Sequence, residues 1–302
     1  MPDILLLLPD FLLIVLGFVL CRWSALDRSV WDAAERLVYY LLFPVLLFNS
    51  ILTSALHPAQ TLSLAGAAVA TVACGVVLAM ALKFAPGVDA RLHASGAQVA
   101  FRFNSFIALA LSERLGGPQA LAWVALMIAL CVPLCNIAAV WPLARHGGHA
   151  YGRELLRNPL ILATVGGLLA NLAGVHLPAA VGTTLQRIGL AALPIGLMAV
   201  GAGLRLGGLK AAPVLAAALL SLRHAVLPLL AIGLTSAPML ALPAEQRVVV
   251  VLFAALPTAS SAYVLAARMG GDGGYVAGLV TVSTLLGMLS VPAWLAVLAW
   301  LG

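Results

Sequence analysis

A cluster of polar side chains follows a proline late in the chain, in the apolar stretch LFAALPTASSAYVLAARMGG (252–271). A proline removes a backbone donor and clashes with the carbonyl one turn earlier, so it interrupts a helix. An interrupted helix exposes amide donors, which favour an anion, and carbonyls, which favour a cation. The pattern predicts a binding site made of backbone groups and hydroxyls. Its candidate residues here are Pro257, Thr258, Ser260, Ser261 and Tyr263.

A second polar stretch, FRFNSFIAL (101–109), aligns with the first stretch and places Asn104 opposite Thr258. If both segments are interrupted and cross, these two residues approach each other at the centre. Arg102 stands two positions before the asparagine and flanks the same crossing. The alternative is that the proline only kinks its helix and that the hydroxyls bond between helices.

Other polar residues also fall inside apolar segments, where they are functional candidates or interhelical hydrogen-bonding groups. Asn136 and Asn49 extend the expected site, whereas Arg223 either attracts an anion or anchors a helix. Proton coupling would have to use Asp10 or His224, while sodium held by carbonyls and hydroxyls, and passive uniport, stay open. The predicted substrate-binding residues are Asn104, Pro257, Thr258, Ser260, Ser261, Asn136, Asn49, Arg102 and Tyr263.

Catalytic chemistry is not expected. Ser260 and Ser261 have no histidine nearby in the sequence, and neither paired carboxylates nor a metal-ligand spacing is present. The GxxxxGK[ST] pattern of a P-loop does not occur, which argues against ATP-driven transport. We therefore expect no enzyme activity, no metal site and no cofactor.

Composition identifies the surroundings of these residues. Of the 302 residues, 63% are hydrophobic and 9% charged, and the mean hydropathy is +1.11. A soluble domain has about 25% charged residues, so this chain could not cover its surface in water. The net charge of +6 comes from basic residues spread singly among loops, without the basic run expected of a nucleic-acid-binding protein. The sequence predicts an all-α polytopic membrane protein.

Ten segments are long enough to cross a membrane, which requires about 20 apolar residues each. Eleven of the 16 Lys and Arg residues lie in or beside loops that join an odd span to the next even one, and three lie near helix ends on the other side. The eleven include Arg28, Arg36, Arg145, Arg153 and Arg157. The positive-inside rule then places both termini outside the membrane. The expected spans are 4–22, 33–55, 60–83, 92–114, 118–142, 156–176, 180–204, 211–234, 246–268 and 273–300.

The two halves of the chain, 1–150 and 151–302, repeat each other. FPVLLF (43–48) matches LPIGLM (193–198), and SFIALALSERLGG matches ASSAYVLAARMGG further along. Two copies of a unit with five spans must enter the membrane from opposite faces. The expected architecture is therefore two inverted five-helix repeats, which is typical of secondary transporters with a central site. Its interrupted, crossed helices are the fourth and the ninth.

Several stretches of this sequence resemble the auxin efflux carrier family, which includes PIN-type carriers and bacterial relatives labelled malonate transporters. The resemblance covers nearly the whole chain in order, without a long central loop. It therefore implies the compact bacterial type of this family and a bacterial-type inner membrane. It is carried by FPVLLFNSI (43–51), FRFNSFIALAL (101–111), RNPLILATVGGLLANLAGVHLP (157–178), LPIGLMAVGAGL (193–204) and ALPTASSAYVLAARMGGD (255–272).

The resemblance implies ten helices, with a scaffold part and a transport part that move relative to each other, and a small organic anion held at the crossed helices. Asn104 and Pro257 match the asparagine and proline of that family's crossing. Ala108 and Ala110 stand where many members have Gly and Pro, so the ninth segment carries the stronger sign of interruption.

The function expected is secondary active or facilitative transport of an auxin- or malonate-like carboxylate by alternating access. The alternatives are a sodium- or proton-coupled symporter of a bile-acid-like anion and, in another class, a channel or sensor. The expected partners are the organic anion and membrane lipid, with a homodimer as an open option and no nucleic acid.

Overall fold

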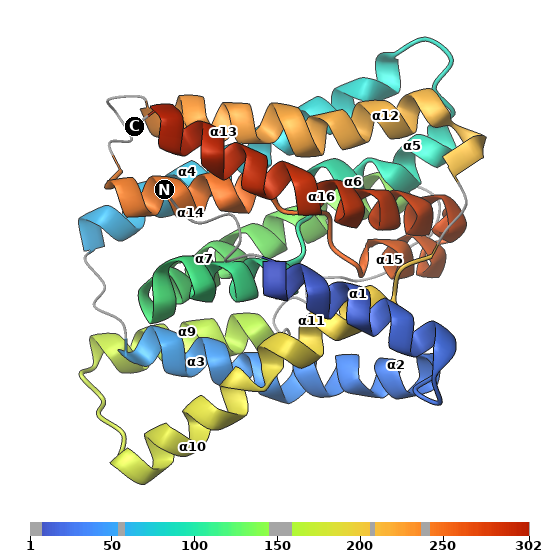
Figure 1. Ribbon diagram of the computed structural model, residues 1–302. Helices are drawn as coiled ribbons and strands as arrows, with labels where there is room; N and C mark the ends of the chain where they lie inside the picture. Colours follow the sequence, from blue (N-terminus) through green and yellow to red (C-terminus); the bar gives the residue numbers. More distant parts are fainter. Residues whose placement is uncertain (1–7, 54–57, 145–158, 206–208, 237–241, 302) are drawn as a thin grey trace.

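The computed structural model describes residues 8–53, 58–144, 159–205, 209–236 and 242–301 (Figure 1). Throughout these ranges the chain forms helices and connecting turns, without a β-strand. The expected boundary at residue 150 and three arginines of the charge count, Arg145, Arg153 and Arg157, lie outside the described residues. Each of the ten expected spans contains helix.

The helices follow one another with short connections. The first half contains α1 (Leu8–Trp23), α2 (Arg28–Leu37), the π-helical turn η2 (Val38–Leu42), α3 (Phe43–Thr53), α4 (Pro58–Ala81), the 3-10 turn η3 (Leu82–Phe84), α5 (Ala90–Gly96), α6 (Gln98–Phe101) and α7 (Ser105–Ala144). The second half contains α9 (Pro159–Leu172), α10 (Ala179–Leu190), α11 (Ala192–Ala202), η4 (Leu209–Ala211), α12 (Pro213–Ser221), the π-helical turn η5 (Leu222–Val226), α13 (Leu227–Ser236), α14 (Ala244–Ala255), α15 (Ala262–Arg268) and α16 (Gly273–Leu301).

Six helical stretches among the described residues are long and apolar enough to cross a membrane, which identifies a multi-pass membrane protein. One of them, Ala90–Leu143, covers two of the expected spans. It is not a single rod, because α6 and α7 are separated and Gly117 has a φ of 58° inside α7. Of the other expected spans, α1, α9 and the interrupted pair α14 and α15 are too short to count. Ten crossings stay a prediction. The six stretches are Arg28–Thr53, Leu62–Phe84, Ala90–Leu143, Ala179–Ala202, Pro213–Ser236 and Gly273–Leu301.

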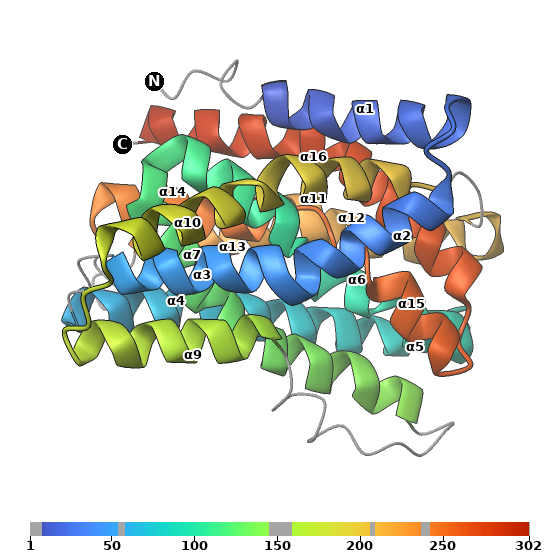
Figure 2. The same ribbon diagram turned by 90° about the horizontal axis from the view of Figure 1, so that it is seen from below.

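The helices pack as two groups. A lower group in Figure 1 contains α1, α2, α3, α9, α10 and α11, which contact mainly each other. Within it, α3 and α9 lie side by side, as the view from below also shows (Figure 2). An upper group contains α4, α5, α6, α12, α13, α14, α15 and α16. Helix α7 contacts both groups and lies between them.

Close backbone approaches hold the lower group together. A Cβ atom added to Gly17 of α1 would overlap the carbonyl of Met198 on α11, and one added to Gly201 of α11 would overlap the carbonyl of Ile14 on α1. Small residues that let two backbones touch are a common means of joining membrane helices, because no hydrophobic force acts between helices in lipid. These glycines therefore fix α1 against α11.

Candidate functional site

The first interruption of helix lies between α6 and α7 and contains neither glycine nor proline. Arg102 leaves helical geometry with φ −75° and ψ 145°. Asn104 then caps α7, because its Oδ1 accepts from the amides of Phe106 at 3.0 Å and Ile107 at 3.2 Å. The Nδ2 of Asn104 has no hydrogen-bond partner, although the residue is only 2% exposed. A buried donor without a partner costs free energy and marks a place where a ligand or water can bind.

The second interruption separates α14 from α15 and is caused by Pro257. A residue before proline is driven out of helical geometry, and Leu256 indeed has a ψ of 146°. The amide of Thr258 donates to Ser283 Oγ on α16 at 3.0 Å. Gly287, one turn further along α16, leaves room for the proline ring, since an added Cβ would lie 3.0 Å from its Cδ.

The two interruptions touch each other. The backbone amide of Asn104 donates to the carbonyl of Pro257 at 2.9 Å. The guanidinium of Arg102 donates to Ser261 Oγ at 3.2 Å and to Gln98 Oε1 at 2.9 Å. Segments more than 150 residues apart in the sequence are thus joined by a backbone bond and a side-chain bond.

Two adjacent residues of the π-helical turn η5 support the second interruption. The guanidinium of Arg223 donates to the carbonyls of Leu256, at 2.5 Å, and Phe253, at 3.2 Å. The ring of His224 lies between Ser283 Oγ, at 2.9 Å, and Ser290 Oγ, at 2.8 Å. Arg223 therefore binds the carbonyl end of α14. His224 contacts Ser283, whose hydroxyl accepts from the amide of Thr258 on the other side of Pro257.

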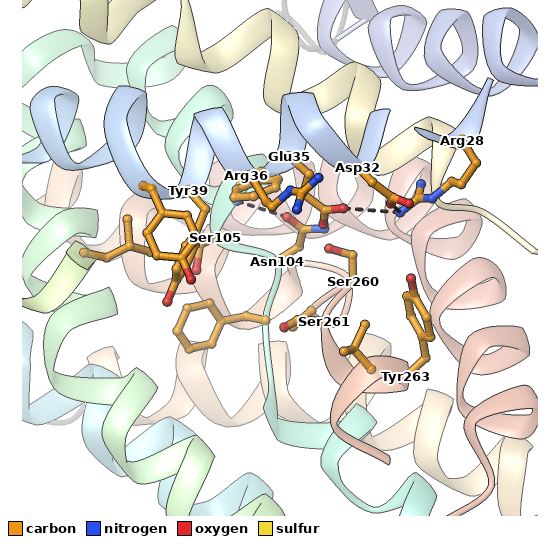
Figure 3. Close-up of a pocket in the computed structure, with 16 residues that line it drawn as sticks. Arg28, Asp32, Glu35, Arg36, Tyr39, Asn104, Ser105, Ser260, Ser261 and Tyr263 are labelled. Atoms are coloured by element: carbon orange, nitrogen blue, oxygen red, sulfur yellow. Dashed lines mark hydrogen bonds and ion pairs between the residues drawn. The ribbon is translucent and has the colours of Figure 1, made fainter. Parts of the chain in front are cut away.

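A cavity of about 520 Å³ lies where the interruptions face the lower helix group. Figure 3 shows charged side chains of α2 on one wall and the residues of the interruptions and α15 on the other. Arg28 pairs with Asp32 at 2.9 Å and with Glu35 at 3.2 Å. The lining residues are Arg28, Asp32, Glu35, Arg36, Tyr39, Tyr40, Phe103, Asn104, Ser105, Phe106, Leu160, Ala259, Ser260, Ser261, Tyr263 and Val264.

A smaller cavity of about 120 Å³ shares part of this lining and adds Arg102, Cys135 and Asn136. The formal charges of Arg28 and Arg36 balance those of the two α2 carboxylates in the larger cavity, so Arg102 gives the two cavities together a net positive charge. The positive end of the α7 helix dipole, at Ser105, adds to it. The arrangement favours a small anion.

Comparison with known proteins identifies the family of the chain. Residues 145–295, half of the chain, match the membrane transport protein family, which is the family of PIN-like auxin efflux carriers. The chain belongs to this family. A search of curated proteins found no match to the sequence. The multi-pass helical fold and the family together identify a membrane transporter.

The structure of the transporter brings most of the predicted site residues together. Asn104, Ser260, Ser261 and Tyr263 line the larger cavity, Arg102 and Asn136 line the smaller one, and Ser261 lines both. Pro257 and Thr258 do not line either cavity. Both residues are buried, and the Oγ1 of Thr258 has no hydrogen-bond partner.

Asn49 lies elsewhere in the transporter, in a separate cavity of about 530 Å³ at the ends of α3 and α9. In the same cavity Asn171 donates to the carbonyls of Ile51, at 3.0 Å, and Leu52, at 2.9 Å, and so satisfies the end of α3. Asp10, considered for proton coupling, forms an ion pair with Arg114 at 2.9 Å between α1 and α7.

Sequence reasoning missed the charged wall of α2. It placed the second span at 33–55 and assigned Arg28 and Arg36 to a cytoplasmic loop. In the transporter the helix begins at Arg28, after Asp27, whose carboxylate accepts from the amides of Ser29 and Val30. The signal was present, because four charged residues recur at helical spacing along one face: Arg28, Asp32, Glu35 and Arg36.

Proposed function

We propose that the chain is a secondary carrier that binds a small organic anion, through its carboxylate, where the two interruptions meet. One observation carries the proposal: the Nδ2 of Asn104, the residue that caps α7, is buried without a partner in the wall of a cavity. Helix N-termini favour anions because their free amides and dipole point outwards. A carboxylate oxygen would give this donor its missing partner.

The shape of the cavity supports an organic anion rather than a bare inorganic ion. Its volume of about 520 Å³ lies in the range of ligand sites for small molecules, about 300–1,000 Å³. Aromatic rings line it beside the polar groups, including Tyr39, Phe103 and Tyr263. The anionic end of the substrate would lie against Asn104, and its carbon skeleton against these rings.

The proposed mechanism is alternating access. The cavity lies between the two helix groups, so a displacement of one group against the other would change the side from which it is reached. One feature supports an inverted repeat of two five-helix units: the interruptions occur at aligned positions of the two halves, with Asn104 opposite Thr258. We also propose ten crossings, a bacterial-type inner membrane, external termini and a homodimer as parts of this assignment.

The experiment is binding of a panel of mono- and dicarboxylates to the purified transporter, followed by counterflow in proteoliposomes. Asn104→Asp keeps the cap of α7, because aspartate is an equally good capping residue. It replaces the free donor by a negative charge. Loss of such a hydrogen bond costs about 1–3 kcal/mol of binding free energy, so we expect carboxylate affinity to fall about 10- to 100-fold. Ser112→Ala, which removes a buried hydroxyl bonded to Leu109 of the same helix, is the control.

The two variants must differ for the proposal to hold. Equal carboxylate affinity and equal counterflow in the Asn104→Asp and wild-type proteins would remove Asn104 from the site. Fast flux that does not saturate with substrate would identify a channel instead of a carrier.

A further inference from the structure

We propose that Arg223 serves as a built-in cation at the interruption of α14, so that the transporter needs no sodium ion at this position. In membrane carriers with broken helices, the carbonyl end of a half-helix is where a coupling cation is bound. Here a guanidinium of the protein itself occupies that end. The inference rests on the proposed transport function, but its central test needs no substrate.

The position of the guanidinium is fixed by two carbonyls. Its Nε donates to the carbonyl of Leu256 at 2.5 Å, and its Nη2 donates to that of Phe253 at 3.2 Å. The last carbonyls of a helix have no partner within the helix and carry the negative end of its dipole. Arg223 thus supplies both the missing hydrogen bonds and the positive charge that a bound cation would supply.

Burial strengthens the electrostatic interactions of the Arg223 charge, because they are stronger away from bulk water. Arg223 is 1% exposed, and among the described residues it forms no ion pair with a carboxylate. A buried charge is costly unless neighbouring groups compensate it, and here the carbonyl end of α14 is the compensating group. A second cation beside the same carbonyls would be repelled by the guanidinium.

The π-helical turn η5 explains how Arg223 reaches this place. Its extra residue per turn belongs to a class of helix irregularities that are frequent at functional sites. The next residue, His224, contacts Ser283 and Ser290, which are both uncharged. Since Ser283 in turn accepts from Thr258, η5 fixes the interruption on both sides of Pro257, with a cation on the carbonyl side only.

The experiment measures thermal unfolding of the purified transporter in sodium, potassium and choline chloride at equal ionic strength, without substrate. We expect no sodium-selective shift of the melting temperature for the wild type. Arg223→Gln removes the charge, so we expect a lower melting temperature that sodium raises more than potassium or choline does. Arg223→Lys keeps the charge and is expected to stay insensitive to sodium.

Arg187→Gln is the matched control, because it removes an exposed guanidinium from α10 and should leave the sodium response unchanged. A sodium-selective shift of the melting temperature in the wild type or in Arg223→Lys would overturn the inference. The inference can therefore be refuted with these two proteins even if Arg223→Gln does not fold. An Arg223→Gln protein that folds and gains no stabilisation from any of the three cations would overturn it too.

Transport adds a second readout. For the carboxylate of the panel that binds best, wild-type counterflow should proceed at equal rates in sodium and potassium, and faster counterflow in sodium would contradict the inference. If no carboxylate of the panel binds the wild type, the proposed function fails, while the unfolding data still show whether Arg223 replaces a sodium ion.

Discussion

Gly287 makes the position of Pro257 open to a direct test. An added Cβ at Gly287 would lie 3.0 Å from the Cδ of Pro257 and 3.1 Å from both its Cβ and Cγ. Ordinary contacts between carbon atoms lie at about 3.5–4.0 Å, so Gly287→Ala must push the ring away by several tenths of an ångström. Overpacking of this kind costs about 1–3 kcal/mol. Replacing glycine by alanine inside a helix stabilises the helix by up to about 1 kcal/mol, which offsets part of this cost.

Gly233→Ala separates these two effects. Gly233 lies in α13, and an added Cβ there meets no atom within 4 Å. Both variants gain the same helix propensity, so their difference in free energy of unfolding isolates the contact with Pro257, and we expect about 1–3 kcal/mol in favour of Gly233→Ala. Thermal unfolding of the purified proteins measures this difference.

Binding provides the second half of the test. Displacement of Pro257 would stretch the hydrogen bond that its carbonyl accepts from the amide of Asn104, now 2.9 Å, and so would disturb the proposed anion site. We expect weaker carboxylate binding for Gly287→Ala and unchanged binding for Gly233→Ala. Identical melting temperatures and identical affinities in the two variants would refute the claim that Gly287 positions the interruption.

Two further predictions concern charged groups at helix ends. Hydrogen bonds from Ser29 and Val30 lower the pKa of the exposed Asp27 carboxyl below its ordinary 3.8, so its stabilisation of α2 is present above pH 3.8 and is lost as pH falls through the lowered pKa. Asp27→Asn should therefore make the melting temperature depend less on pH below about pH 5. The same pH dependence in the variant and the wild type would show that the Asp27 carboxylate does not stabilise α2. Asp10→Asn should destabilise the protein by about 1–3 kcal/mol, because it removes the carboxylate that accepts from the partly exposed guanidinium of Arg114. A double-mutant cycle with Arg114→Gln measures this coupling, and a coupling of zero would show that the pair contributes nothing.

The interruptions differ in how well the sequence predicted them. Pro257 acts on its own backbone neighbours, so the second interruption can be located from the sequence alone. The first interruption contains no such residue, and it was indicated by the alignment with the other half and by the family resemblance at Asn104. It is stabilised by the cap that Asn104 forms and by contacts of Arg102 and Asn104 with Ser261 and Pro257, over 150 positions away. Contacts of this kind do not leave a local pattern in the sequence.

The lining of the cavity was predicted in part, for a related reason. A polar residue in an apolar segment can be recognised, but the face on which it lies cannot. Asn136 and Asn49 look alike in the sequence, yet one lines the smaller cavity and the other a separate cavity at the far end of α3. The two readings of Arg223, substrate attraction and anchoring, likewise depended on a π-helical turn that the sequence did not indicate.

The close helix contacts that a sliding motion would break are distributed unevenly over the fold. Within the lower group, Gly17 and Gly201 bring the backbones of α1 and α11 into contact, and Gly167 of α9 approaches the carbonyl of Phe48 on α3, where an added Cβ would lie at 2.9 Å. Sliding these helices past one another would break many close contacts at once. Between the groups lies the cavity, and α7 is the helix that contacts both. In the proposed alternating-access mechanism, a displacement of the upper group past the lower group would therefore break fewer of these close contacts, and it would carry the interruptions past the charged wall of α2.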